Sequence, residues 1–233
     1  RADNASTSSG IALDLNGSAR SLGNGSVTLT TDSLGISNDS TLSAGSGTVT
    51  VQTRTASTLL DVGSTSADAT SGTLKLGISS AELASISAGT VVLGRSDATA
   101  NTTLNAINLG GMGNTSGNLT VLGNDITVND NLTKTAGTDA TLSLRARGNI
   151  NVAANKTITS TSGKLKVELN SDSDANNAGA IVMNSGSGIT SNGGDIRLSG
   201  GTYHDSNLSW AYGTATSPHG ISLTGTQISA GGG

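Results

Sequence analysis

The sequence predicts an all-β protein, a right-handed parallel β-helix (a solenoid) of about ten coils. Short aliphatic strands recur about every eight residues, separated by turns rich in Gly, Asn, Ser and Asp. The connections are too short for crossover helices, and three such strands per circuit of roughly 20–25 residues are typical of this fold. In the second half of the chain we expect strands at 119–121, 126–128, 142–144, 150–152, 158, 165–167, 181–183, 189 and 196–198.

The same pattern, in a looser form, predicts strands at 11–15, 27–29, 49–51 and 59–62. No change of composition separates this part from the rest, so we expect a single domain over residues 1–233.

Two segments interrupt the pattern. Near 79–88, Leu83 and Ile86 lie three residues apart behind serines suited to cap a helix, which predicts a short helical or corner insertion. An aromatic loop is expected at 203–219, because the chain's two tyrosines, its tryptophan and its proline all lie there.

The composition fits a thin solenoid better than a disordered chain. Gly, Ser, Thr and Asn make up just over half of the residues, and phenylalanine is absent. Charged residues are only 12% with a net charge of −4, and the aliphatic residues alternate regularly. Stacked Val, Ile and Leu side chains fill a narrow interior without aromatic residues, and Val128 and Ile150 are expected to face inward.

Charge and hydropathy exclude several classes of function. The pI near 4.9, without a basic stripe, argues against a nucleic-acid partner. No apolar run is long enough to form a transmembrane segment. The chain starts without a basic and apolar leader, so we expect any signal peptide to be removed or to lie upstream. The absence of cysteine is compatible with export of an unfolded repeat protein.

Two regions resemble a known family. The segment AELASISAGTVVLGR (81–95) is one, and the other comprises LKVELNSDSD (165–174), AGAI (178–181) and ITSNGGDIRLSGG (189–201). Both resemble repeat segments of the filamentous-haemagglutinin-like large exoproteins, the adhesins exported by two-partner secretion. The Asn-Pro-Asn type element of that family's secretion domain is missing here, so an internal β-helix repeat region of a longer protein is the expectation.

The resemblance implies a location and partners. It implies secretion through an outer-membrane secretion partner, folding at the bacterial cell surface, and adhesion to a host or matrix glycan or protein receptor. The expected role is therefore a structural and adhesive rod segment that mediates attachment to host cells, matrix or biofilm.

A candidate calcium site follows the strand at 165–167. Asn170, Asp172, Asp174 and Asn176 place side-chain oxygens at alternate positions, as at the start of a calcium loop, and we take Asp172, Asp174 and Asn176 as the candidate ligands. The pattern lacks the glycine and the bidentate glutamate of a full calcium loop. An Asp/Asn-rich turn that caps backbone amides is the alternative interpretation.

The aromatic loop contains the candidate ligand-binding residues Tyr203, Trp210 and Tyr212. Aromatic rings beside polar groups suit the apolar faces of sugars. The alternative is that the loop folds back on the solenoid wall and the rings only pack there.

An enzyme and a filament subunit are the alternatives to an adhesive rod. Catalysis on polysaccharides needs carboxylates that converge in a cleft, whereas the acidic residues here are spread along the turns, so we expect no enzyme. The alternative to an adhesin is a self-assembling extracellular filament subunit, a homopolymer whose coil ends stack head to tail.

Overall fold

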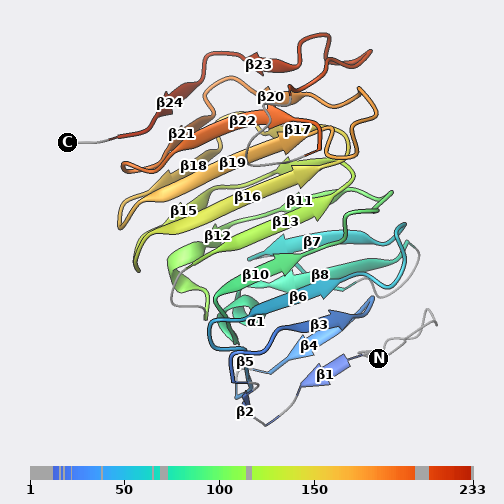
Figure 1. Ribbon diagram of the computed structural model, residues 1–233, viewed down its shortest axis with the longest axis vertical. Coiled ribbons are helices and arrows are strands. Elements are labelled where there is room, and N and C mark those ends of the chain that lie inside the picture. Colours follow the sequence, from blue (N-terminus) through green and yellow to red (C-terminus); the bar gives the residue numbers. More distant parts are fainter. Residues whose placement is uncertain are drawn as a thin grey trace.

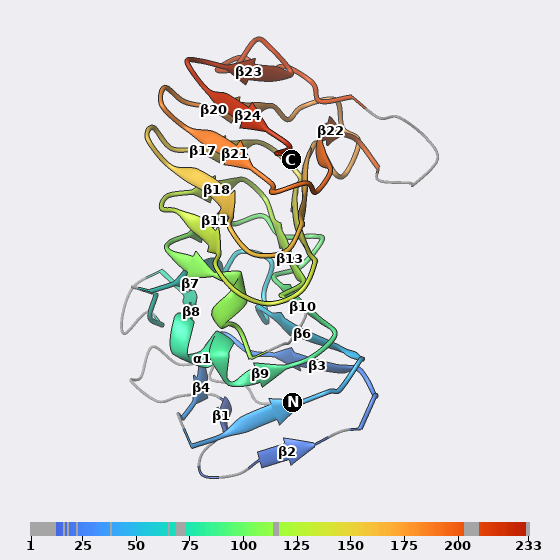
Figure 2. The same cartoon turned by 90° about the vertical axis from the view of Figure 1, so that its left-hand side faces the viewer.

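The computed structural model describes residues 13–15, 17, 19–21, 23–37, 39–64, 66–68, 73–113, 117–202 and 210–231. The protein is all-β, and its strands pair in parallel, so the predicted fold class is confirmed at this level. The strands follow one another along the long axis of the molecule, from the N-terminal to the C-terminal part of the chain (Figures 1 and 2).

Two of the sheets in the described residues hold seven strands each. The first is formed, in spatial order, by β3 (Val27–Thr30), β6 (Thr48–Gln52), β10 (Thr90–Leu93), β13 (Leu119–Gly123), β16 (Ala140–Ala146), β19 (Leu165–Ser171) and β22 (Ile196–Gly200). The second is formed by β8 (Lys75–Ser79), β7 (Leu59–Gly63), β11 (Thr102–Leu104), β14 (Ile126–Val128), β17 (Ile150–Val152), β20 (Ile181–Met183) and β23 (Ile221–Leu223).

Three smaller sheets complete the described strands. One is formed by β12 (Ile107–Asn108), β15 (Leu132–Lys134), β18 (Thr157–Ser160), β21 (Gly188–Thr190) and β24 (Gln227–Ser229). The other two are formed by β2 (Ala19–Ser21), β5 (Thr41–Ser43) and β9 (Ile86–Ser87), and by β1 (Leu13–Leu15) with β4 (Leu34–Ile36).

Equivalent positions in successive strands stack in register. Leu104 pairs with Val128, Val128 with Val152, and Val152 with Met183. Side chains that bridge neighbouring layers in this region join residues 23 to 26 positions apart. One layer of the fold in this region therefore spans about three of the eight-residue strand intervals in the sequence.

The core is made of the inward members of each alternating strand. In β13, Leu119 and Val121 are buried, while Thr120 between them is partly exposed. Val128 and Ile150 have no exposed surface, which confirms the predicted inward side of their strands. Because each strand is only a few residues long, burial comes from stacking on the strands above and below it.

A short helix, α1 (Ser80–Ala84), lies within the segment for which the sequence predicts a helical turn or corner. Ser79 caps it and forms a capping box with Glu82, and Leu83 anchors it in the core. A 3₁₀ turn, η1 (Leu109–Gly111), follows β12. Within the described residues no helix has the length and hydropathy needed to cross a membrane.

One lysine is buried at a turn. The Lys134 side chain ends inside the fold, where its ammonium donates to the carbonyl oxygens of Ala136 (3.1 Å), Gly137 (3.2 Å) and Ser162. Desolvation lowers the pKa of Lys134, and the nearby Asp139 opposes that effect. The ammonium thus joins the turn that follows its own strand to the turn of the next layer.

The inward assignment predicts a contrast between buried and exposed positions. Val128→Asp and Ile150→Asp would each lower the free energy of unfolding by more than about 4 kcal/mol, because each buries a carboxylate without a partner. Lys166→Ala is the control, since Lys166 is half exposed and forms a surface ion pair with Glu168 at 2.6 Å; its expected loss is below about 1 kcal/mol. Urea denaturation measures the free energy of unfolding of all three variants, and equal losses would contradict the assignment.

Candidate ligand-binding site

The segment after β19 forms a tight turn with unusual backbone angles. Asp172, Ala175 and Asn177 all have positive φ, at 52°, 55° and 66°. Asparagine and aspartate tolerate this region, whereas for alanine it costs about 1 kcal/mol. The Asp172 carboxylate holds the turn, since its Oδ1 accepts from the backbone N–H of Asn176 at 2.9 Å and of Ala178 at 3.4 Å.

Asp172 is completely buried, yet its second oxygen is not used. No hydrogen-bond donor from the described residues reaches Asp172 Oδ2. A buried acceptor without a donor is unfavourable by about 1–3 kcal/mol. The carboxylate is therefore fixed by Oδ1 and keeps one oxygen available for something other than the turn.

A pocket of about 230 Å³ adjoins this turn. Asp172, Ala175 and Asn177 form one part of its lining. The remaining lining residues come from after β22 and from the middle of the aromatic loop: Gly201, Thr202, Trp210 and Tyr212. The pocket thus brings together two candidate sites that lie far apart in the sequence.

The aromatic side of the pocket is tied to the turn by backbone pairing. Tyr212 N–H donates to the Gly179 carbonyl at 3.0 Å, within an antiparallel bridge between these residues. A Cβ atom at Gly179 would lie 2.5 Å from the Asp172 backbone nitrogen, so the close approach requires glycine. Trp210 is 67% exposed. Tyr203 lies outside the described residues.

Asp174, the second candidate metal ligand, is paired with an arginine. Its Oδ2 accepts from Arg147 Nη2 at 2.9 Å and Nε at 3.1 Å, and from Asn176 Nδ2 at 3.2 Å. The remaining Arg147 group, Nη1, donates to the Ala98 carbonyl at 2.9 Å. Across the described ranges, no three His, Cys, Asp or Glu side chains gather into a metal-binding group. Calcium at this turn stays a prediction.

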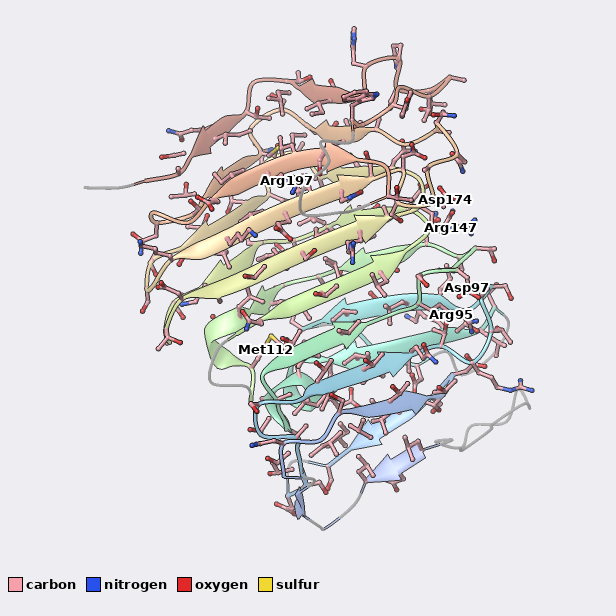
Figure 3. All side chains as sticks on the ribbon, in the orientation of Figure 1. Arg95, Asp97, Met112, Arg147, Asp174 and Arg197 are labelled. Atoms are coloured by element: carbon pink, nitrogen blue, oxygen red, sulfur yellow. The ribbon has the colours of Figure 1, made fainter. Side chains whose placement is uncertain are left out.

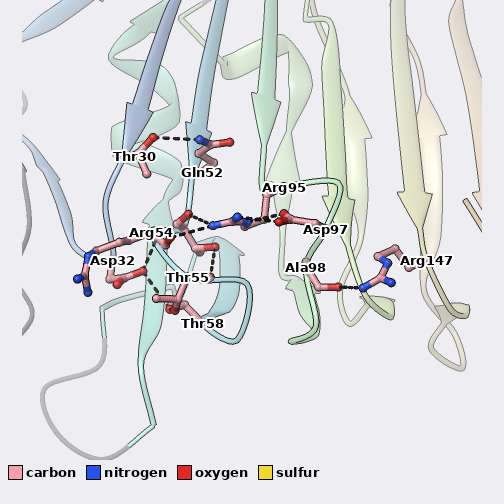
Figure 4. Close-up of polar contacts among 11 residues, drawn as sticks. Thr30, Asp32, Gln52, Arg54, Thr55, Thr58, Arg95, Asp97, Ala98 and Arg147 are labelled. Atoms are coloured by element: carbon pink, nitrogen blue, oxygen red, sulfur yellow. Dashed lines mark hydrogen bonds and ion pairs between the residues drawn. The ribbon is translucent and has the colours of Figure 1, made fainter. Parts of the chain in front are cut away.

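A second arginine, which follows β10 and lies two layers before Arg147, makes the same kind of link. Arg95 Nη1 donates to the carbonyl oxygens of Thr53 and Arg54, and its Nε and Nη2 form a two-point contact with Asp97 at 2.6 and 2.8 Å. Figure 3 shows these side chains along the same edge of the molecule as Arg147, and Figure 4 shows their bonds. The arginines therefore hold successive layers together at the edge on which Asp174 lies.

Two other hollows were not anticipated from the sequence. One of about 340 Å³ lies between α1 and η1 against Leu83 and Met112, and another of about 330 Å³ lies beside Lys164 and Asp195. Neither is lined by a buried polar atom that lacks a partner. The pocket at Asp172 differs because it combines such an atom with an exposed aromatic ring.

Comparisons of this chain with protein-family models, with curated proteins and with solved structures found no match. The function is therefore inferred from the fold and from the pocket.

The link between Arg95 and Asp97 predicts a specific titration. The hydrogen bond from Arg95 is the main cause that lowers the pKa of Asp97 below 3.8. A lowered folded-state pKa stabilises the fold above pH 3.8, and this contribution is lost as the pH falls through the folded-state value. NMR titration of the Asp97 carboxyl carbon should give a midpoint below 3.8, and Arg95→Gln should return it toward 3.8. Arg197→Gln, in β22, is the control and should leave the midpoint unchanged.

Proposed function

We propose that the chain is a structural and adhesive rod segment of a secreted bacterial surface exoprotein. In this proposal it winds as a right-handed parallel β-helix and mediates attachment to host cells, matrix or biofilm. The in-register parallel layers and the narrow aliphatic core support the rod. The resemblance of residues 81–95 and 165–201 to filamentous-haemagglutinin-like exoproteins supports two-partner secretion and a location at the cell surface.

The pocket beside Trp210 is the observation that carries the adhesive part of the proposal. Trp210 presents a largely exposed ring next to a polar pocket formed by Asn177, Thr202 and Tyr212. A sugar ring has one apolar face and a rim of hydroxyl groups, so it would stack on the indole while its hydroxyls face the polar lining. A volume of about 230 Å³ suits one sugar unit of a host or matrix glycan.

The rod is proposed to act without catalysis. The Asp172 side chain fixes the turn, and Asp174, two residues further along the chain, is paired with Arg147. Recognition of a receptor surface needs no more than a rigid pocket held by stacked layers. Binding is then expected to leave the glycan intact.

The proposed contact predicts the effect of removing the indole. After a glycan array has identified a bound glycan, Trp210→Ala should weaken its binding about tenfold, which corresponds to about 1.4 kcal/mol. Calorimetry measures the affinity. Leu74→Ala is the control, because Leu74 is an exposed apolar side chain outside the pocket. Equal affinity of Trp210→Ala and the parent protein would overturn the proposed contact, as would the absence of glycan binding.

The second candidate function that we propose is a filament subunit, and it concerns the last described layer. Ile221, Leu223 and Ile228 are 41%, 48% and 39% exposed, although their register partners in β20 and β21 are fully buried. They continue the core columns of β20 and β21 into the last described layer. Another copy of the chain, stacked with its first layer on these strands, would cover them and repeat the contact without closing into a ring.

Electron microscopy tests the filament. If the chain polymerises through this end, purified protein forms long uniform fibres, and the double change Ile221→Lys with Leu223→Lys prevents them because it places two charges in the contact. Leu74→Lys is the matched control and should leave the fibres intact. Isolated short rods from the parent protein would contradict the filament and leave the adhesive rod as the remaining proposal.

A further inference from the structure

The turn after β19 contains an unusual concentration of unused oxygen atoms. In the described part of the chain, six buried side-chain polar atoms lack a hydrogen-bond partner. Three of these six belong to one five-residue segment: Asn170 Oδ1, Asp172 Oδ2 and Asp174 Oδ1. All three are acceptors, and their burial without a donor is unfavourable by about 1–3 kcal/mol each.

Each of these side chains is already held by its other polar atom. Asn170 Nδ2 donates to the Gly201 carbonyl at 3.2 Å, which also establishes that the unused atom is the amide oxygen. Asp172 uses Oδ1 in the turn, and Asp174 uses Oδ2 for Arg147. The three free oxygens are therefore fixed in advance by contacts that a bound group would not need to break.

The chemistry of the three oxygens favours a cation over a neutral donor. Two belong to carboxylates and one to an amide, the oxygen ligands that calcium prefers. Arg147 balances one of the two carboxylates, so one negative charge remains on the segment. Both Asn170 and Asp172 are more than nine-tenths buried, and a cation would compensate their unpaired oxygens.

We propose that Asn170 Oδ1, Asp172 Oδ2 and Asp174 Oδ1 bind a calcium ion, with water from the adjoining pocket completing its coordination. This ligand set differs from the one expected from the sequence, because Asn176 is exposed whereas Asn170 has a buried amide oxygen without a partner. With three protein oxygens and one net charge, the site belongs to the weak extracellular range, with a dissociation constant of about 10⁻⁴–10⁻³ M.

Terbium luminescence offers a direct test on the full chain. Tb³⁺ occupies calcium sites, and its emission is excited through a nearby indole. Trp210 is the only tryptophan and lines the same pocket as Asp172, so excitation of the indole reports on Tb³⁺ bound near this pocket. Saturable sensitised emission that millimolar Ca²⁺ displaces is the expected result. Calorimetry with Ca²⁺ provides an affinity that does not depend on the indole.

Matched variants locate the ion. Asp172→Asn keeps the shape of the side chain and an oxygen for the turn, and should weaken both Tb³⁺ and Ca²⁺ binding at least tenfold. Asp97→Asn removes a carboxylate outside the pocket and should bind as the parent protein does. Circular dichroism checks that Asp172→Asn remains folded. Absence of saturable binding, or equal binding by Asp172→Asn and the parent protein, would overturn the site.

The calcium site and the glycan contact can fail separately. Glycan affinity measured in EDTA tests the contact at Trp210 without calcium, and Ca²⁺ calorimetry without glycan tests the ion. Glycan binding without calcium binding would remove the inference and keep the proposed function. Calcium binding without glycan binding would do the reverse.

Discussion

The in-register stacking of aliphatic side chains is the constraint on which the rest of the molecule depends. The column that runs from Leu104 through Val128 and Val152 to Met183 buries each side chain against those above and below it. A three-residue strand has no stability of its own, so each layer relies on its neighbours. The same dependence explains why Ile221, in the last layer that the structure describes, is exposed while its partner Ile181 is buried.

Stacking alone leaves the turns unsupported, and charged side chains supply the missing donors there. Lys134 bonds carbonyls of two successive turns, and Arg95 and Arg147 each join carbonyl oxygens of an earlier layer to a carboxylate. Charged donors to carbonyl groups form strong hydrogen bonds when partly shielded from water. The chain has no cysteine and therefore no disulfides, so non-covalent contacts such as these connect the turns of different layers.

The all-β class, the parallel layers and the inward side of Val128 and Ile150 follow from the sequence because alternation and spacing are local properties. The burial of Lys134 could not be predicted from the sequence, because its acceptor at Ser162 belongs to the turn of the next layer. The position of Trp210 beside Asp172 could not be predicted from the sequence either, because it depends on the pairing of Tyr212 with Gly179. Contacts between layers decide such positions, and no local pattern encodes them.

Unusual backbone angles and buried polar atoms without partners are concentrated in the turn that lines the pocket. Three of the five non-glycine residues with positive φ in the described chain, Asp172, Ala175 and Asn177, belong to one turn. That turn also supplies two of the buried oxygens without donors. A sequence selected only to continue the stack would place glycine at 175 and a satisfied polar group at 172. Since both features reduce stability, their coincidence beside an exposed indole favours a turn shaped to bind a ligand over a connection between strands.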